Sequence, residues 1–314
     1  MGESDRYIDY NRKRLSLGDD RNSLTTLICI NAVLFLIISF INIIYYVTQS
    51  LPGSFENDIL PGFVMPAKIT LVAHHPWTIF TSIFTHVGDR PVVALITNML
   101  WLWAFGYIFQ SVAGNRKLIP LYLYGGVMGA FVFILANYAI APLRAGITSA
   151  GFFGANASIL AIAVATTYLA PDYRIFRMLN GGIPLWVITL LYVVIDFAGI
   201  SAAGSAYHLA HLAGGFIGFM FVFSLRKGVD WSNWMNRSYD WFSDLFNPVK
   251  KQHPVKRMRE KVFYKAGNQK PFIKTTNITQ QRIDEILDKI NQKGYHLLTE
   301  EEKNILNRAG ESDI

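Results

Sequence analysis

Six long apolar stretches run through residues 24–225 of this chain, and they constrain its fold more than any other feature. The hydrocarbon core of a bilayer is roughly 30 Å thick, so about 20 mostly apolar helical residues cross it. We expect spanning helices over residues 24–47, 92–112, 118–140, 152–170, 183–200 and 207–225. Six such runs with short connections are unusual for buried helices of a soluble protein. The sequence therefore predicts an all-α membrane protein with six transmembrane helices.

Basic residues alternate between the connections. They collect before the first stretch and after the second, fourth and sixth, as Arg12, Lys13, Arg14, Arg21, Arg116, Lys117, Arg174, Arg177, Arg226 and Lys227. The other connections hold only Lys68, Arg90 and Arg144. Cytoplasmic loops of membrane proteins are enriched in Lys and Arg. We therefore expect a multi-pass protein of the cell (inner) membrane with both termini cytoplasmic, and we assign the net charge of +7 to topology rather than to nucleic-acid binding.

The composition predicts four consecutive parts. They are a cytoplasmic N-terminal segment (1–22), a six-helix membrane domain (23–226), a basic and aromatic juxtamembrane linker (227–275) and a cytoplasmic helical hairpin (276–314). In the hairpin, apolar residues recur at helical spacing over 279–292. Thr299 with Glu302 three residues later forms a capping box for a second helix. The single cysteine, Cys29, excludes an intrachain disulfide and a cysteine-based metal site.

The connection between the first and second stretches is not a polar linker. Residues 49–91 contain many apolar and aromatic side chains, including Trp77 and Phe80. Tryptophan is enriched at membrane interfaces, where its ring keeps one edge in water. We expect a structured loop that lies partly in the outer leaflet, packed on protein because its backbone needs hydrogen-bond partners there.

A histidine stands out in the sixth stretch. His211 occurs in the pattern A-H-x-x-G-x-x-x-G, and the helical spacing places it on the same face as Gly214 and Gly218. Glycines let two helix backbones approach closely in a membrane. His211 should therefore point at a neighbouring helix. There it either forms a structural hydrogen bond or belongs to a functional site.

Several motifs occur in an order that resembles the rhomboid intramembrane serine proteases. They are Pro76-Trp77, Phe84-Thr85-His86, Asn98-Met99-Leu100, Phe105-Gly106, Gly114-Asn115-Arg116-Lys117, Gly154-Ala155-Asn156-Ala157 and the pattern around His211. The resemblance covers about Trp77 to Gly218 and implies a six-helix rhomboid-like bundle. The C-terminal hairpin resembles one appended to such proteins in bacteria of the Bacteroidetes type.

The resemblance also implies which residues carry the site. Rhomboid proteases use a serine nucleophile and a histidine base, and His and Asn side chains in an H-x-x-x-N arrangement hold the oxyanion. The base corresponds to His211 and the oxyanion asparagine to Asn98. The nucleophile position holds Asn156, and the oxyanion histidine position holds Ala94. An amide is not a nucleophile at neutral pH, and an alanine side chain donates no hydrogen bond.

These two replacements predict a loss of proteolysis. One missing oxyanion donor slows catalysis about 10²–10³-fold, and a missing nucleophile slows it on the order of 10⁶-fold. We expect a silenced rhomboid that binds transmembrane or other membrane-protein clients without cleavage. We expect Asn156 to pair with His211 through a hydrogen bond, since an amide both donates and accepts.

The alternative is an active intramembrane serine endopeptidase that uses His211 and a displaced serine. Ser158 is the surrogate candidate, although two helical residues rotate it about 200° from Asn156. Thr148 and Ser149 reach the site only if their loop folds inward. A transporter is disfavoured because the stretches hold no ladder of charges and the two halves show no repeat.

We also considered a metal site. His208 and His211 share a helix face, and His74, His75 and His86 lie in the first loop. The nearest carboxylate is Asp196, which the sequence does not place clearly beside them. We therefore expect no metal and no cofactor. The expected partners are transmembrane proteins and the lipid bilayer, with no nucleic acid, and the oligomeric state is open.

Overall fold

The structure is a computed structural model that describes residues 22–48, 51–175, 181–200, 204–245 and 280–311. The chain divides into two compact units, Met1–Phe246 and Asn247–Ile314. The first unit extends beyond residue 226, the predicted end of the membrane domain. It includes a helix that the sequence analysis assigned to the linker 227–275.

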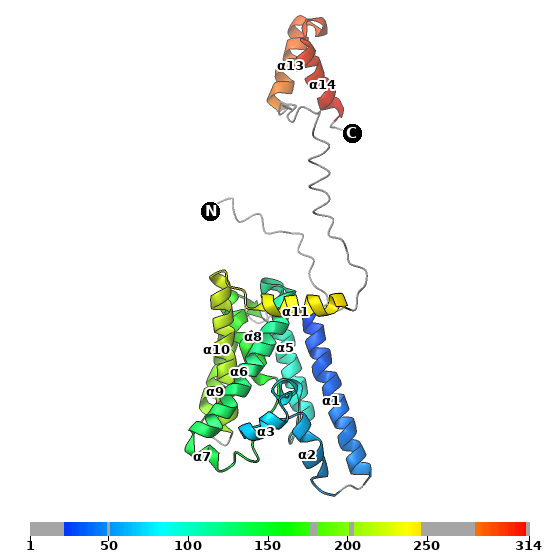
Figure 1. Ribbon diagram of the computed structural model, residues 1–314. Helices are drawn as coiled ribbons and strands as arrows, with labels where there is room; N and C mark the ends of the chain where they lie inside the picture. Colours follow the sequence, from blue (N-terminus) through cyan, green and yellow to red (C-terminus); the bar gives the residue numbers. More distant parts are fainter. Residues whose placement is uncertain (1–21, 49–50, 176–180, 201–203, 246–279, 312–314) are drawn as a thin grey trace. The chain divides into compact units, whose positions relative to one another are not determined.

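Four helices of the first unit are long and apolar enough to cross a membrane: α1 (Ser23–Val47), α5 (Pro91–Ala113), α6 (Leu118–Ala139) and α10 (Ser205–Arg226) (Figure 1). Two shorter apolar helices, α8 (Asn156–Leu169) and α9 (Leu185–Gly199), accompany them. Each predicted stretch therefore contains a helix. Because α8 and α9 have only 14 and 15 residues, the count of six spans stays a prediction.

The fourth stretch begins later as a helix than the range 152–170 predicts. Its first residues form β2 (Gly151–Phe152), which pairs antiparallel with β1 (Met65–Pro66). Gly154 then adopts a φ of +102°, a conformation that L side chains rarely take. The chain turns there, and the helix starts at Asn156. The predicted start was wrong because apolar composition does not distinguish a buried strand and turn from a helix.

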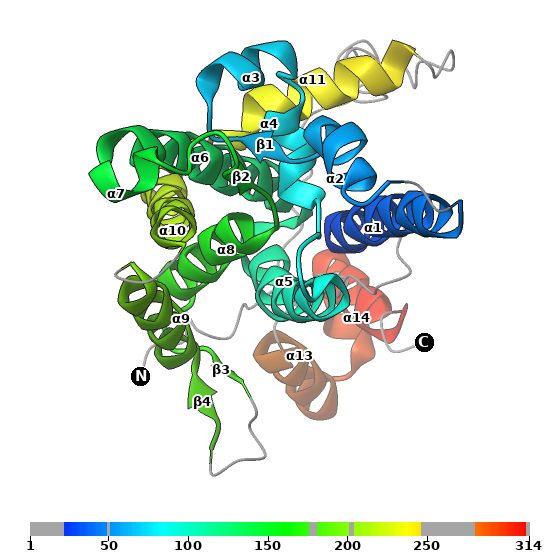
Figure 2. The same ribbon diagram turned by 90° about the horizontal axis from the view of Figure 1, so that it is seen from below.

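Helix α8 lies at the centre of the bundle and contacts α5, α6, α9 and α10 (Figure 2). A Cβ atom at Gly214 of α10 would lie 2.2 Å from the carbonyl oxygen of Ala157 in α8. A Cβ atom at Gly218 would lie 2.1 Å from the carbonyl oxygen of Ala161. The two backbones therefore touch, which confirms that the glycine face of α10 packs on a neighbouring helix.

The segment between α1 and α5 is structured, as predicted. It contains α2 (Ser54–Asp58), η2 (Leu60–Gly62), β1, α3 (Ile69–His74), α4 (Thr78–Thr81) and η3 (Ser82–Phe84). The Trp77 indole N–H donates to the Gly62 carbonyl at 3.0 Å. The hydroxyls of Thr81 and Thr85 donate to the Phe63 carbonyl at 3.2 and 3.3 Å. These bonds satisfy backbone groups inside the loop, whereas its depth in a membrane stays a prediction.

Shorter elements complete the first unit. They are η4 (Asn115–Lys117), α7 (Ala141–Arg144), the antiparallel pair β3 (Arg174–Ile175) and β4 (Ile183–Pro184), and α11 (Ser232–Leu245). Helix α11 is anchored where Tyr124 donates to the Trp231 carbonyl at 2.9 Å. Arg116 pairs with Asp240 at 3.1 Å. The exposed aromatic side chains of α11, such as Trp241, suit a helix that lies in a membrane interface.

The second unit confirms the helical hairpin. It comprises α13 (Gln280–Lys293), η6 (Tyr295–Leu297) and α14 (Glu300–Glu311). The Thr299 N–H donates to Glu302 Oε2 at 2.9 Å, and the Glu302 N–H donates to Thr299 Oγ1 at 3.3 Å. The predicted capping box is therefore present. Ile286 and Leu298 are buried between the two helices.

Candidate functional site

One carboxylate joins two histidines inside the first unit. The Nδ1 atom of His211 lies 2.9 Å from Oδ1 of Asp196, and the Nδ1 atom of His208 lies 2.9 Å from the same oxygen. Asp196 stands in the last turn of α9, and both histidines stand in the first two turns of α10. Asp196 and His211 are buried, whereas the His208 side chain is 28% exposed.

This contact identifies the ring nitrogen that donates in each histidine. An ionised carboxylate only accepts hydrogen bonds, so each Nδ1 carries the proton that it donates to Asp196. The other nitrogen of His211, Nε2, is then the basic one. An acidic residue thus orients the family's base position, as in a Ser-His-Asp triad. The sequence analysis missed this role, although an acidic residue inside an apolar stretch is itself a signal of function.

Asn156 does not pair with His211. It is the first residue of α8 and is half-buried. Within the part of the chain that the structure describes, its side chain forms no hydrogen bond, and the Nδ1 atom of His211 is turned to Asp196 instead. The predicted hydrogen bond between Asn156 and His211 was therefore wrong. The hydrogen bond that His211 forms goes through Nδ1 to Asp196, and among the described residues its Nε2 forms no hydrogen bond with Asn156.

The residue at the predicted oxyanion position, Asn98, meets a side chain that the family pattern does not name. Asn98 is buried in α5, and its Nδ2 lies 3.1 Å from Nε2 of His86 in the loop. The Nδ1 atom of His86 lies 3.2 Å from the Phe84 carbonyl, so Nδ1 donates and Nε2 accepts from Asn98. Burial lowers the pKa of His86, which favours this neutral ring. Ala94 is exposed one turn before Asn98 on the same helix.

The family's H-x-x-x-N spacing would put the histidine on the same helix as Asn98. In this chain the imidazole beside Asn98 is that of His86, which comes from the loop before α5. The sequence analysis named His86 in a family motif and among possible metal ligands, but not as a partner of Asn98. Because His86 accepts a bond from the Asn98 amide, that donor is already used within the protein. The hydrogen bond therefore ties the loop to α5, and it does not leave the Asn98 amide free to hold an oxyanion.

The candidate surrogate nucleophiles do not reach His211. Ser158 is fully buried in α8 and faces α6, where a Cβ atom at Gly125 would lie 3.0 Å from the Ser158 Cα. Ser149 is exposed, and its hydroxyl donates to the Gly146 carbonyl at 3.2 Å. Thr148 is exposed as well. Among the described residues, no serine or threonine hydroxyl is hydrogen-bonded to His211.

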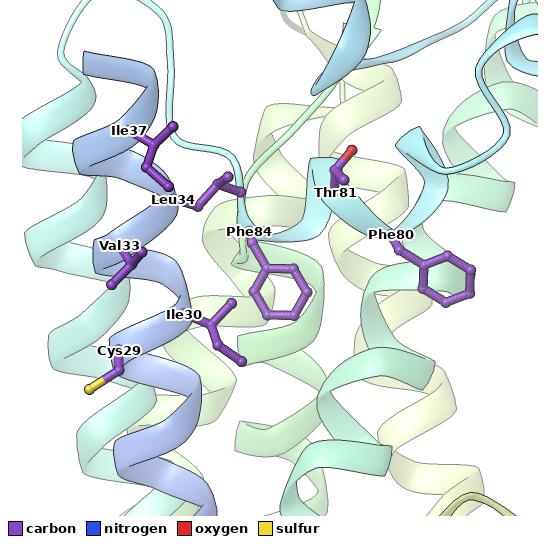
Figure 3. A pocket seen from close by; sticks show the side chains of 8 residues that line it. All are labelled: Cys29, Ile30, Val33, Leu34, Ile37, Phe80, Thr81 and Phe84. Carbon is purple, nitrogen blue, oxygen red and sulfur yellow. The ribbon is translucent and has the colours of Figure 1, made fainter. Parts of the chain in front are cut away.

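An apolar groove lies between α1 and the α4–η3 segment, with a cavity volume of about 480 Å³ (Figure 3). Its lining residues are Cys29, Ile30, Val33, Leu34, Ile37, Phe80, Thr81 and Phe84. The wall formed by η3 is tied to the nucleophile position, because the Gly154 N–H donates to the Ser82 carbonyl at 2.9 Å. Only Ala155 separates Gly154 from Asn156 in the sequence.

Comparison with known families assigns the second unit to a family without a described role. Residues 274–311 match a family of unknown function (DUF6576). The match covers α13 and α14. It carries no functional assignment.

The first unit matches a family whose description agrees with the geometry above. Residues 73–228 match the Rhomboid domain, which covers η3 and the helices from α5 to α10. The chain is also 28% identical over 144 residues to the presenilin-associated rhomboid-like protein A, mitochondrial, of Danio rerio. That alignment covers 45% of this chain and 35% of the relative. Together with its long apolar helices, the match shows that this chain is a rhomboid-family membrane protein.

Proposed function

We propose that this protein binds transmembrane segments of other membrane proteins and does not cleave them. One inference carries the proposal: the family resemblance puts Asn156 at the nucleophile position, while His211, at the base position, is bonded to Asp196. An amide cannot deliver the attacking oxygen that a base activates. Without the nucleophile, the rate of peptide hydrolysis falls on the order of 10⁶-fold.

The polar residues around the site remain buried and bonded to one another. This order favours a retained binding role over a protein that has lost its function altogether. Asp196, His211 and Asn98 are buried and hydrogen-bonded. Buried polar groups without partners would destabilise a membrane protein by several kcal/mol each, on the order of the whole stability of a domain. The pairs therefore hold α9 against α10 and the loop against α5.

The groove between α1 and η3 is the proposed docking place for the client. Of its eight lining residues only Thr81 carries a hydroxyl, and the rest are apolar. An apolar helix of a client would cover Val33 and Phe80, which are 54% and 53% exposed. The groove wall η3 is bonded to the turn before Asn156, so a client in the groove lies beside the former nucleophile position.

The same proposal places the protein in the cell (inner) membrane with both termini in the cytoplasm. Arg116, Lys117 and Arg226 support this orientation, because they lie at one end of the bundle. Arg226 donates to the Tyr168 carbonyl at the end of α8, and Ser23 at the start of α1 bonds Asn115. The side rich in Lys and Arg is the cytoplasmic one.

Cleavage of a model transmembrane substrate in proteoliposomes tests the first half of the proposal. The unmodified chain should leave the substrate intact, and Asn156→Ser combined with Ala94→His should cleave it slowly. The Asn156→Gln variant is the matched control, since it changes the same site without adding a hydroxyl. Robust cleavage by the unmodified chain, abolished by Ser158→Ala, would favour the alternative of an active endopeptidase with a displaced serine.

Site-specific photocrosslinking tests the second half. A photoreactive residue at Val33 faces the groove, whereas one at Ile43 lies on the same helix, is 57% exposed and does not line the groove. Crosslinks to a co-reconstituted transmembrane peptide should form from position 33 and not from position 43. Crosslinks to lipid alone from position 33 would show that an acyl chain occupies the groove, and would contradict the proposed docking place.

A further inference from the structure

The Asp196, His208 and His211 side chains form a cluster whose hydrogen bonds leave one atom without a partner. Oδ1 of Asp196 lies 2.9 Å from both Nδ1 atoms. Oδ2 of the same carboxylate is buried and has no hydrogen-bond partner among the described residues. The Asp196 side chain is only 5% exposed. A buried carboxylate oxygen without a partner is costly, so the cluster is incomplete as hydrogen bonds alone.

The charge of the cluster leads to the same conclusion. With both histidines neutral, the carboxylate leaves one negative charge inside the bundle, and burying a charge without a counter-ion is strongly unfavourable. Protonating Asp196 on Oδ2 would remove the charge but would leave a buried O–H donor without an acceptor. A divalent cation bound to the carboxylate and to both Nδ1 atoms would offset the buried negative charge, with each imidazole carrying its proton on Nε2 instead of Nδ1.

The ligand set fits a transition-metal ion. Two imidazole nitrogens and one carboxylate oxygen suit Zn²⁺ and its first-row neighbours, and metal-binding atoms of the three residues lie within 4.8 Å of one another. Zinc binds such atoms at about 2.0–2.2 Å, which in a tetrahedral site separates them by about 3.3–3.5 Å. The observed 2.9 Å separations need to open by only a few tenths of an ångström.

The backbone holds these ligands in place. His208 and His211 are three residues apart on α10, so they share one face of the helix. The His208 ring lies over Gly199 at the end of α9, where an added Cβ atom would come within 2.4 Å of the imidazole. Only a residue without a side chain leaves room for the ring to reach Asp196. Three protein ligands beside a partly exposed His208 leave one coordination position open to a small ligand.

We propose that Asp196, His208 and His211 form a binding site for one divalent transition-metal ion, with Zn²⁺ as the best-fitting ion. The site is independent of the missing nucleophile, because none of its ligands corresponds to Asn156 or Ala94. It goes beyond the proposed client binding, since it can hold an ion whether or not a client is bound. It also revises the expectation of no metal, which depended on Asp196 having no clear place beside the histidines.

Titration of the purified full-length protein with Co²⁺, after treatment with a chelator, tests the site. Co²⁺ replaces zinc in such sites and absorbs visible light in low-coordinate N/O environments. We expect one Co²⁺ per chain, displaced by one equivalent of Zn²⁺. Asp196→Asn and His208→Gln should weaken binding by more than about 100-fold, because even the loss of an outer partner of a ligand weakens metal affinity 10–100-fold.

His74→Gln is the matched control, because His74 is an exposed histidine outside the cluster and should leave binding unchanged. His208 is partly exposed, so we expect the His208→Gln variant to fold. Size-exclusion chromatography checks that this variant elutes as a monodisperse species. An unmodified protein that binds no Co²⁺ or Zn²⁺ would overturn the proposal, as would equal binding by all variants. Neither result would affect the cleavage or crosslinking tests.

Discussion

The Oδ1 atom of Asp196 lies 2.9 Å from the Nδ1 atom of His211, and this contact joins α9 to α10 inside the bundle. It makes the histidine of the family's dyad part of a structural link between helices. The link does not involve Asn156. The contact between α9 and α10 is therefore independent of the side chain at position 156.

Removing the carboxylate should destabilise the protein. In metal-free protein, Asp196→Ala leaves two ring donors without their acceptor, which costs about 1–3 kcal/mol for a buried group. Asp196→Asn keeps an acceptor oxygen and should cost less. Thermal unfolding in detergent micelles measures both, and Asp172→Ala is the control because Asp172 is exposed. Equal unfolding temperatures for Asp196→Ala and Asp172→Ala would show that the contact contributes no stability.

The glycine face of α10 should respond to added methyl groups according to what each one meets. Gly218→Ala places a Cβ atom 2.1 Å from the Ala161 backbone oxygen, so the helices must separate. Forced overpacking of this kind costs about 1–3 kcal/mol, or more where backbone is involved. Gly215→Ala is the matched control, because its Cβ atom would meet only the Leu160 and Val164 side chains at 3.2 Å or more.

Unfolding of these two variants in the same detergent should rank Gly218→Ala well below Gly215→Ala and the unmodified protein. A similar loss at both positions would indicate that α10 tolerates no substitution at all, rather than that its contact with α8 is tight. A similar stability of all three proteins would contradict the close approach of the α8 and α10 backbones.

The pair of His86 and Asn98 should make stability depend on pH. Burial lowers the pKa of His86 in the folded protein, so the unfolded chain takes up a proton first as the pH falls. The stability that the neutral ring provides is complete above the unfolded pKa of about 6.5. It is lost as the pH falls below that value. His86→Gln keeps a side-chain acceptor but does not titrate, so its unfolding temperature should fall less between pH 7.5 and pH 5.5.

A double-mutant cycle between His86→Ala and Asn98→Ala measures the contact itself. A coupling energy of about 1 kcal/mol is expected for a buried hydrogen bond. Additive losses would show that the two residues stabilise the protein independently. The cycle is best measured at pH 7.5, where the ring is neutral in both states.

Much of the architecture could be predicted from the sequence because hydrophobic length and glycine spacing act locally. Each of the six apolar stretches predicted a helix that is present in the bundle of the first unit. Gly214 and Gly218 predicted the face of α10 that packs closely on α8. Thr299 and Glu302 gave the capping box, since both partners lie within one turn. The start of α8 was misplaced because β2 depends on pairing with β1, which is distant in sequence.

The partners of the site residues could not be predicted for the same reason. Family spacing identified His211, Asn98, Asn156 and Ala94 as positions, but it did not say which side chain each would meet. His211 meets Asp196 from the preceding helix, and Asn98 meets His86 from the loop. Both contacts depend on how neighbouring elements pack in three dimensions. A polar residue in an apolar stretch indicates that a polar partner exists, but the sequence does not show which residue that partner is.

The capping box of the C-terminal hairpin should control the first turn of α14. Thr299→Ala removes the acceptor of the Glu302 N–H, and losing such a cap costs about 1 kcal/mol, which is roughly a fivefold change in the opening equilibrium. Hydrogen exchange of the full-length protein, followed by mass spectrometry, should show faster exchange in the peptide that contains the first turn of α14. Glu301→Gln is the control, since Glu301 is exposed and lies outside the box. Unchanged exchange in Thr299→Ala would contradict a stabilising role for the cap.

The acid in the same box should make that protection sensitive to low pH. The hydrogen bonds from Lys289 and from the Thr299 backbone N–H lower the pKa of Glu302 to about 2. Because the folded pKa lies below the unfolded value, the contribution is complete above about pH 4.5 and is lost as the pH falls toward 2. Exchange in the first turn of α14, corrected for the intrinsic pH dependence, should accelerate over this range. Glu302→Gln should remove most of the pH dependence, and a variant that keeps the full dependence would assign it to another group.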